Sequence, residues 1–179
     1  MKRRQVVGML GAGAGLAASG ALTGCATVGG QQAKVVVIGG GFAGATAAKY
    51  IRMWSEGSVQ VTLVEPNAAF VSCPISNLVL GGVKTMADIT TPYDNLNKRH
   101  GVQMVRDKVV AIDAAARTVK LAGGSSLAYD RLIVSPGVDF MYETIPGLNN
   151  AQAQSAIMHA WKAGPQTVTL RKQLEAMPD

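Results

Sequence analysis

The 179-residue chain has few charged residues, few aromatic residues and almost no cysteine, and each shortage excludes a class of protein. Only 16% of the residues are charged, and no basic run is interleaved with aromatic residues, so the net charge of +6 does not indicate a nucleic-acid-binding surface. With Cys25 and Cys73 as its only cysteines, the chain cannot build a disulfide framework. It also has no C-x-x-C-H sequence, which excludes a haem attached to this chain through that motif.

Long hydrophobic runs are absent too, and we therefore expect no transmembrane span. The most apolar segment, residues 6–23, is interrupted by glycines and is at the short limit of the roughly 20 residues that a spanning helix needs. This segment follows Lys2, Arg3 and Arg4 and precedes a run of small residues. The layout predicts an export signal over residues 1–30.

Two details refine the export prediction. Arg3-Arg4, followed after Gln5 by two valines, resembles a twin-arginine signal, which exports folded proteins to the periplasm; an ordinary secretory signal is the alternative. The sequence that ends at Cys25 resembles a lipoprotein cleavage box, in which this cysteine would carry a lipid. If Cys25 instead leaves with the signal, Cys73 is the single cysteine of the mature chain.

The remaining residues predict one α/β domain over residues 34–179, because 48% hydrophobic content is enough for one ordinary core. A run of β-branched residues over 35–38 predicts a strand buried on both faces, which is followed by a helix over 42–54 and a second strand over 59–64. This is a βαβ unit. The later elements are expected as a loop over 69–82, a helix over 94–100, a third parallel strand over 102–105, an antiparallel meander over 109–113, 118–121 and 126–129, a buried strand over 132–134 and a helix over 159–177 that starts or kinks at Pro165.

Gly39, Gly41 and Gly44 form a G-x-G-x-x-G motif between the first strand and the first helix. Gly39 permits a tight turn, Gly41 lets a pyrophosphate approach the backbone, and Gly44 lets the helix pack closely on the strand. The helix N-terminus adds free N–H groups and a partial positive charge for the phosphates. Because the chain has 21 glycines, the motif alone is a weak signal.

Glu65 strengthens the prediction of a dinucleotide site. It ends the second strand, about 20 residues after Gly44, where a carboxylate accepts hydrogen bonds from ribose hydroxyls. A carboxylate at this position also disfavours the 2′-phosphate of NADP. The alternative is a strand-end glutamate that faces water.

Residues 129–137, Tyr-Asp-Arg-Leu-Ile-Val-Ser-Pro-Gly, resemble the second FAD motif of flavoproteins with two dinucleotide-binding domains. In that motif a Tyr-Asp pair opens a buried strand that ends in Ala-Thr-Gly or a variant, and the variant here is Ser-Pro-Gly, from Ser135 to Gly137. Gly137 would let the backbone pass close to the cofactor, and a plain turn after the strand is the alternative. Because both motifs occur in order around a predicted meander, FAD is favoured over NAD.

Four stretches, residues 34–51, 64–82, 129–147 and 159–177, resemble the flavin subunit of the flavocytochrome c sulfide dehydrogenases. The resemblance implies a periplasmic, Rossmann-like FAD-binding domain that oxidises sulfide and passes electrons to a c-type cytochrome partner. It also implies that Cys73 carries FAD as a thioether through the 8α-methyl group, which makes the flavin a better electron acceptor. A free buried thiol is the alternative.

Members of that family continue through a second dinucleotide-binding half and carry two further cysteines, which form a redox-active disulfide. This sequence has neither, so we expect an N-terminal portion with no catalytic residue of its own. Two other hypotheses stay open, a quinone- or NADH-linked flavoprotein reductase and a non-catalytic FAD-binding remnant. No metal-binding residue is predicted. The candidate cofactor-binding residues are Gly39, Gly41, Phe42, Ala43, Gly44, Glu65, Pro66, Cys73, Val109, Ser135 and Gly137.

Overall fold

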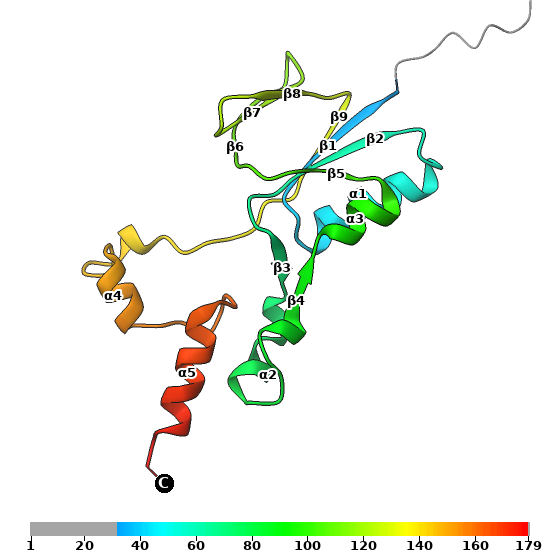
Figure 1. Cartoon of the computed structure of the whole chain (residues 1–179). Coiled ribbons are helices and arrows are strands. Elements are labelled where there is room, and N and C mark those ends of the chain that lie inside the picture. The colour runs from blue at the N-terminus through cyan, green and yellow to red at the C-terminus, as the bar shows by residue number, and fades with distance from the viewer. Residues whose placement is uncertain (1–31, 179) are drawn as a thin grey trace, which may run out of the picture. The chain divides into compact units, whose positions relative to one another are not determined.

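A four-stranded parallel sheet organises residues 32–178, the part of the chain that the computed structural model describes (Figure 1). The predicted export signal over 1–30, Cys25 included, lies outside these residues. The strand order is β5-β2-β1-β9, and every neighbouring pair is parallel, so the expected Rossmann-like α/β fold is confirmed. The strands are β1 (Lys34–Ile38), β2 (Gln60–Val64), β5 (Gln103–Val105) and β9 (Arg131–Val134).

The central strand β1 is buried on both faces of the sheet, as its run of β-branched residues predicts. Val36 is 2% exposed and Val37 is fully buried. Because successive side chains of a strand point to opposite faces, Val35 and Val37 belong to one hydrophobic cluster and Val36 to another. The sheet therefore needs a covering layer on each face.

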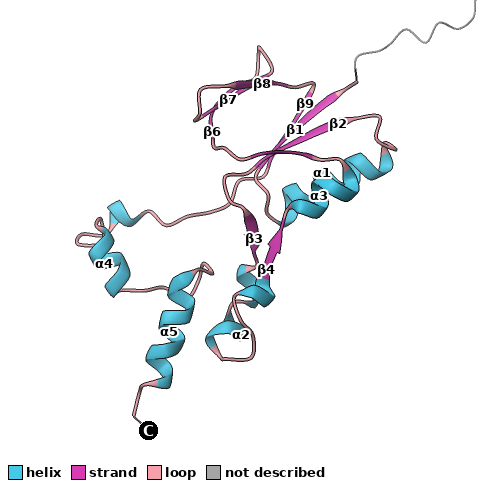
Figure 2. Ribbon diagram, in the orientation of Figure 1, coloured by secondary structure: helices cyan, strands magenta, loops and turns pink. Residues whose placement is uncertain are grey.

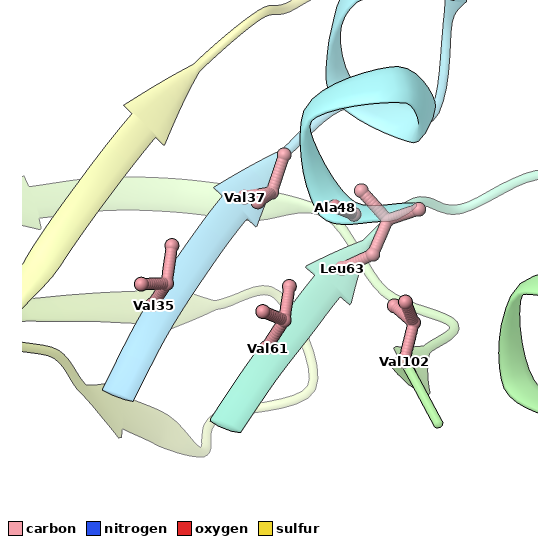
Figure 3. Packing of buried hydrophobic residues seen from close by; sticks show 6 residues of the cluster. All are labelled: Val35, Val37, Ala48, Val61, Leu63 and Val102. Carbon is pink, nitrogen blue, oxygen red and sulfur yellow. The ribbon is translucent and has the colours of Figure 1, made fainter. Parts of the chain in front are cut away.

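Two helices cover the face that holds Val37. They are α1 (Phe42–Trp54) and α3 (Asp94–His100), which contact each other. Figure 3 shows Leu63 of β2 beside Ala48 of α1, whose small side chain lets the helix lie close to the strands. Both helices have the predicted bounds. The N-terminus of α1 lies at the carboxyl edge of the sheet, because α1 directly follows β1.

An antiparallel meander covers the opposite face of the sheet (Figure 2). Val119 and Leu121 of the meander are buried against Val36 and Val64 of the sheet. The meander was predicted correctly, apart from one residue at the end of its last strand. Its strands are β6 (Val109–Asp113), β7 (Thr118–Leu121) and β8 (Ser126–Ala128).

Asp130 joins the start of β9 to the start of β1. Its carboxylate accepts a hydrogen bond from the Lys34 N–H at 2.7 Å, and its own N–H donates to the Lys34 carbonyl at 2.8 Å. The pair fixes the register in which Val35 lies opposite Arg131. The acidic residue of the Tyr-Asp motif thus sets the position of a strand.

The segment predicted as a loop over 69–82 contains regular structure, so that prediction was wrong in part. Its first strand pairs antiparallel with a strand about twenty residues later, and strands of 3 residues are too short for an alternating pattern to show in the sequence. The elements within the segment are β3 (Ala69–Val71), η1 (Cys73–Ile75) and α2 (Asn77–Leu80). After it come η2 (Ala87–Ile89) and β4 (Thr90–Pro92), the partner of β3.

The helix predicted over 159–177 starts at Pro165, one of the two expected roles of that proline, so residues 159–164 are not helical. The helix α5 (Pro165–Glu175) begins at the proline, which has no N–H to leave unpaired there, and an unpredicted helix α4 (Ala151–Ala156) precedes it. Asn150 caps α4, since its side chain accepts a hydrogen bond from the Ala153 N–H at 2.8 Å. A short turn, η3 (Tyr142–Thr144), lies before both helices. Within residues 32–178, no helix is long and apolar enough to cross a membrane.

Candidate functional site

Gly39, Gly40 and Gly41 form the turn between β1 and α1, called here the glycine turn. This turn contacts the residues that follow β9. Gly39 has φ +94°, and a Cβ at this residue would collide with the carbonyl oxygen of Ser135. A Cβ at Gly44 would collide with the Gly39 carbonyl and would lie 2.5 Å from the Ser135 Oγ. These two positions need glycine because of close packing within the protein.

Gly41 differs from these two glycines because its surroundings are open. Nothing lies within 4 Å of the position that a Cβ would take at Gly41. The residue caps α1, and the first N–H groups of a helix have no acceptor within the helix. Phe42 and Ala43, the first two residues of α1, are exposed. Open space beside free N–H groups at the positive end of a helix fits a pyrophosphate.

Glu65 is buried beside the glycine turn, with 8% of its surface exposed. One carboxylate oxygen, Oε2, accepts a hydrogen bond from the Gly40 N–H at 2.8 Å. The other, Oε1, accepts from the backbone N–H and the side-chain amide of Asn67, at 2.9 and 2.6 Å. The alternative of a strand-end glutamate that faces water is therefore wrong.

Gly40 and Tyr93 belong to the same network, and sequence reasoning missed both. The Tyr93 hydroxyl donates a hydrogen bond to the Gly40 carbonyl at 2.9 Å. A Cβ at Gly40 would lie 2.6 Å from this hydroxyl and 2.9 Å from the Glu65 Cγ. The run of three glycines was a signal for Gly40, whereas nothing local marks Tyr93, which lies 53 residues away in the sequence.

The protonation state of Tyr93 follows from its surroundings. The side chain is 5% exposed. Burial, with a smaller contribution from the negative charge of Glu65, raises the pKa of Tyr93 to about 12. The hydroxyl is therefore a neutral hydrogen-bond donor over the physiological range.

The second predicted motif meets the first at Ser135. The Ser135 hydroxyl lies within hydrogen-bonding distance of the Ile38 carbonyl, at 2.9 Å, and of the Gly39 carbonyl, at 3.3 Å. Ser135 thus joins the end of β9 to the glycine turn. Gly137, two residues later, has open space at its Cβ position, as Gly41 does.

The remaining predicted residues lie in different surroundings. Pro66 is exposed and follows Glu65 directly. Val109, in β6, is half-buried, and its side chain packs against the hydrophobic cluster that contains Val64 and Val119. The backbone of β6 changes register between Val109 and Ala111.

Cys73 is an exposed free thiol at the first position of η1, so the alternative of a buried thiol is wrong. The strand that leads to it is held at the start of α1. The rings of Phe70 in β3 and Phe42 in α1 pack edge to face, with centroids 4.7 Å apart. The segment before Cys73 therefore lies next to the glycine turn.

A cavity of about 530 Å³ connects this segment with the glycine turn. Gly41, Phe42, Phe70 and Ser72 line it, together with residues of α3. Glu65, Cys73, Ser135 and Gly137 are not among its lining residues. Within residues 32–178, no group of His, Cys, Asp and Glu side chains is arranged to hold a metal ion.

The chain is similar in sequence to known oxidoreductases. The profile of the pyridine nucleotide-disulphide oxidoreductase family matches residues 33–169. Over 46 residues the chain is 61% identical to the flavoprotein chain of sulfide dehydrogenase (flavocytochrome c) from Chlorobaculum thiosulfatiphilum, a match that covers 26% of this chain and 94% of that sequence.

Longer matches have lower identity. The sulfide-quinone reductase of Aquifex aeolicus is 28% identical over 60% of this chain and 25% of its own length, and a type II NADH:quinone oxidoreductase of Mycobacterium tuberculosis is 34% identical over 64% and 24%. The solved structure of the Aquifex aeolicus sulfide:quinone oxidoreductase shares the fold, with a TM-score of 0.65 and 24% identity over 80% of this chain and 32% of that one. The chain spans about a quarter to a third of the length of these longer relatives.

Proposed function

The chain belongs to the pyridine nucleotide-disulphide oxidoreductase family, and on this basis we propose that it binds FAD as the flavin-binding part of a sulfide:cytochrome c oxidoreductase. The main observation in support of FAD binding is the contact between the glycine turn and Glu65. A buried carboxylate lies 2.8 Å from the N–H of Gly40, next to the open position at Gly41. These are the two parts that an adenine dinucleotide requires, one for its ribose and one for its pyrophosphate.

Each predicted residue has a proposed part in holding the cofactor. The N–H groups of Gly41, Phe42 and Ala43 bind the pyrophosphate, while Gly39, Gly44 and Ser135 shape the turn that presents them. Glu65, which Pro66 helps to orient, accepts hydrogen bonds from the ribose hydroxyls. The backbone at Val109 and Gly137 borders the cofactor. FAD, when bound, supplies two-electron uptake from a donor and one-electron release to an acceptor.

Substitution of Glu65 tests FAD binding. We expect Glu65→Gln to weaken FAD binding about 10- to 100-fold, because hydrogen bonds to a charged acceptor are stronger than those to an amide. Fluorescence titration with FAD, in a Cys73→Ser background that keeps binding reversible, measures this change. Glu56→Gln, at an exposed turn, is the control and should bind FAD as the unaltered chain does. Absence of FAD binding to the unaltered chain would refute the proposed function.

A covalent bond between FAD and Cys73 is a further part of the proposal. Exposure of the thiol and the position of its segment beside the glycine turn support it. We expect flavin fluorescence to stay with the polypeptide after acid denaturation and gel electrophoresis, and to be lost from the band in Cys73→Ser. Flavin that separates from the unaltered chain would remove the covalent bond from the proposal.

The proposed donor and acceptor are sulfide and a c-type cytochrome partner, and the match to a flavocytochrome c flavoprotein chain supports both. A quinone- or NADH-linked reductase is the second candidate, because relatives of these kinds match more of the chain. Anaerobic mixing of the FAD-loaded chain with sulfide or NADH, followed by cytochrome c or a soluble quinone, separates the two. Reduction by NADH alone would favour the second candidate.

We also propose export to the periplasm through residues 1–30. The basic start with Arg3-Arg4 and the apolar segment after it support this proposal. Fractionation of cells that express the chain, with Arg3 and Arg4 both replaced by lysine in a matched variant, measures it. Equal amounts of the two proteins in the periplasm would contradict a twin-arginine route.

A further inference from the structure

The carboxylate of Glu65 has almost no free hydrogen-bonding capacity. An ionised carboxylate offers about four acceptor positions, two on each oxygen. Oε1 already accepts two hydrogen bonds from Asn67, at 2.9 and 2.6 Å, so both of its positions are filled. Oε2 accepts one, from the Gly40 N–H at 2.8 Å. A single position on Oε2 remains.

Local backbone structure holds Asn67 in this arrangement. Pro66 separates Glu65 from Asn67, and its ring fixes the backbone φ angle at that step. The Asn67 N–H can then donate back to the residue two positions earlier, and the side-chain amide reaches the same oxygen. Asn67 itself is exposed while Glu65 is buried.

Tyr93 fixes the other side of the carboxylate. The Tyr93 hydroxyl donates a hydrogen bond to the carbonyl of Gly40, and the N–H of Gly40 donates to Oε2 of Glu65. Tyr93 and Glu65 approach Gly40 so closely that a Cβ would not fit there. The Gly40 N–H therefore fills one acceptor position of Oε2.

We propose that Asn67 is a specificity-determining residue, which limits Glu65 to one hydrogen bond with the adenine ribose of the cofactor. Of the two ribose hydroxyls, one donates to the remaining position on Oε2, and the other finds no acceptor on this carboxylate. The inference rests on the proposed binding of FAD.

Two analogues of FAD, with 2′-deoxyadenosine or 3′-deoxyadenosine in place of adenosine, test the inference. Binding is measured by flavin fluorescence in a Cys73→Ser background, which keeps it reversible. We expect one analogue to bind about 10- to 100-fold more weakly than FAD and the other to bind within about twofold of it.

The variant Asn67→Ala removes the side-chain amide but keeps the backbone N–H, and it frees one position on Oε1. In this variant both analogues should bind about 10-fold or more weakly than FAD, because both hydroxyls then have an acceptor. Asn149→Ala, at an exposed position, is the matched control and should keep the discrimination between the two analogues.

The outcomes separate the inference from the proposed function. Equal losses for the two analogues with Asn67 in place, or unchanged discrimination in Asn67→Ala, would overturn the inference while FAD binding stands. Failure of FAD itself to bind would overturn both.

Discussion

At the scale of single residues, the site depends on polar atoms that are buried with their hydrogen-bond partners. Both backbone polar groups of Gly40 have a side-chain partner, Tyr93 at the carbonyl and Glu65 at the N–H. Within residues 32–178, no buried side-chain nitrogen or oxygen lacks a partner. Removal of one partner in such a network lowers the free energy of unfolding by more than an average hydrogen bond contributes, because the other partner stays buried without a hydrogen bond.

Tyr93→Phe tests this view, since it keeps the ring and removes only the hydroxyl. We expect a loss of about 1–3 kcal/mol in the free energy of unfolding, because the buried Gly40 carbonyl loses its donor. Chemical denaturation at neutral pH measures the loss. Tyr142→Phe, in η3, is the matched control. Equal stability of Tyr93→Phe and the unaltered chain would contradict the proposed role of the hydroxyl.

The pH dependence of stability gives a second signature of Tyr93. Its pKa is about 12 in the folded chain, above the ordinary value of about 10 that holds in the unfolded chain. The unfolded chain therefore releases the proton first, and stability that is fully present below pH about 10 is lost as the pH rises towards about 12. The loss from this group is roughly 2–3 kcal/mol. Tyr93→Phe should lack this component, and denaturation curves at several alkaline pH values measure the difference between the two proteins.

At the scale of elements, a parallel sheet needs contacts that fix the register of its strands, because neighbouring strands are far apart in the sequence. Asp130 supplies one between β1 and β9, and Ser135 supplies another at the opposite end of the same pair. Both residues belong to the motif over 129–137 that sequence reasoning assigned to the cofactor. The motif therefore has a structural part, which is to bring the end of β9 against the glycine turn.

Asp130→Ala tests whether the hydrogen bond between Asp130 and Lys34 fixes the register of β9 on β1. We expect faster amide hydrogen exchange at Lys34 and Val35, and a cost of about 0.5–1.5 kcal/mol, because the Lys34 N–H loses its side-chain acceptor while the backbone bond remains. Asp107→Ala is the control, since Asp107 accepts from the Gly123 N–H in the meander. Faster exchange at β1 in the control, or unchanged exchange in Asp130→Ala, would contradict the prediction.

At the scale of the whole molecule, folding and cofactor binding should be coupled. The chain after β9 exposes apolar side chains between its elements: Val138, Met141 and Ile157 are all more than half exposed. The glycine turn, Glu65 and Ser135 come from strands that meet only in the folded sheet. The unfolded chain therefore has no assembled site for FAD.

FAD should consequently raise the stability of the chain by mass action. At a free FAD concentration about a hundredfold above its Kd, we expect about 2.7 kcal/mol of added unfolding free energy. Urea denaturation with and without FAD, in the Cys73→Ser background, measures this gain, and AMP at the same multiple of its own Kd should give an equal one. A gain of the same size for Glu65→Gln at the FAD concentration used for the unaltered chain would contradict the placement of the ribose at Glu65.

The sequence by itself determined the elements with strong local patterns and the two motifs. The β-branched run of β1, the helix α1 and the spacing from Gly44 to Glu65 are local or periodic, so the order of the residues is enough to predict them. The hydrogen bond between Tyr93 and Gly40, and the contact of Ser135 with Ile38, were decided only by the tertiary structure. Ser135 and Ile38 are 97 residues apart, and Tyr93 and Gly40 are 53 apart. Such contacts form only when parallel strands bring distant residues to one edge of a sheet, and no local pattern encodes them.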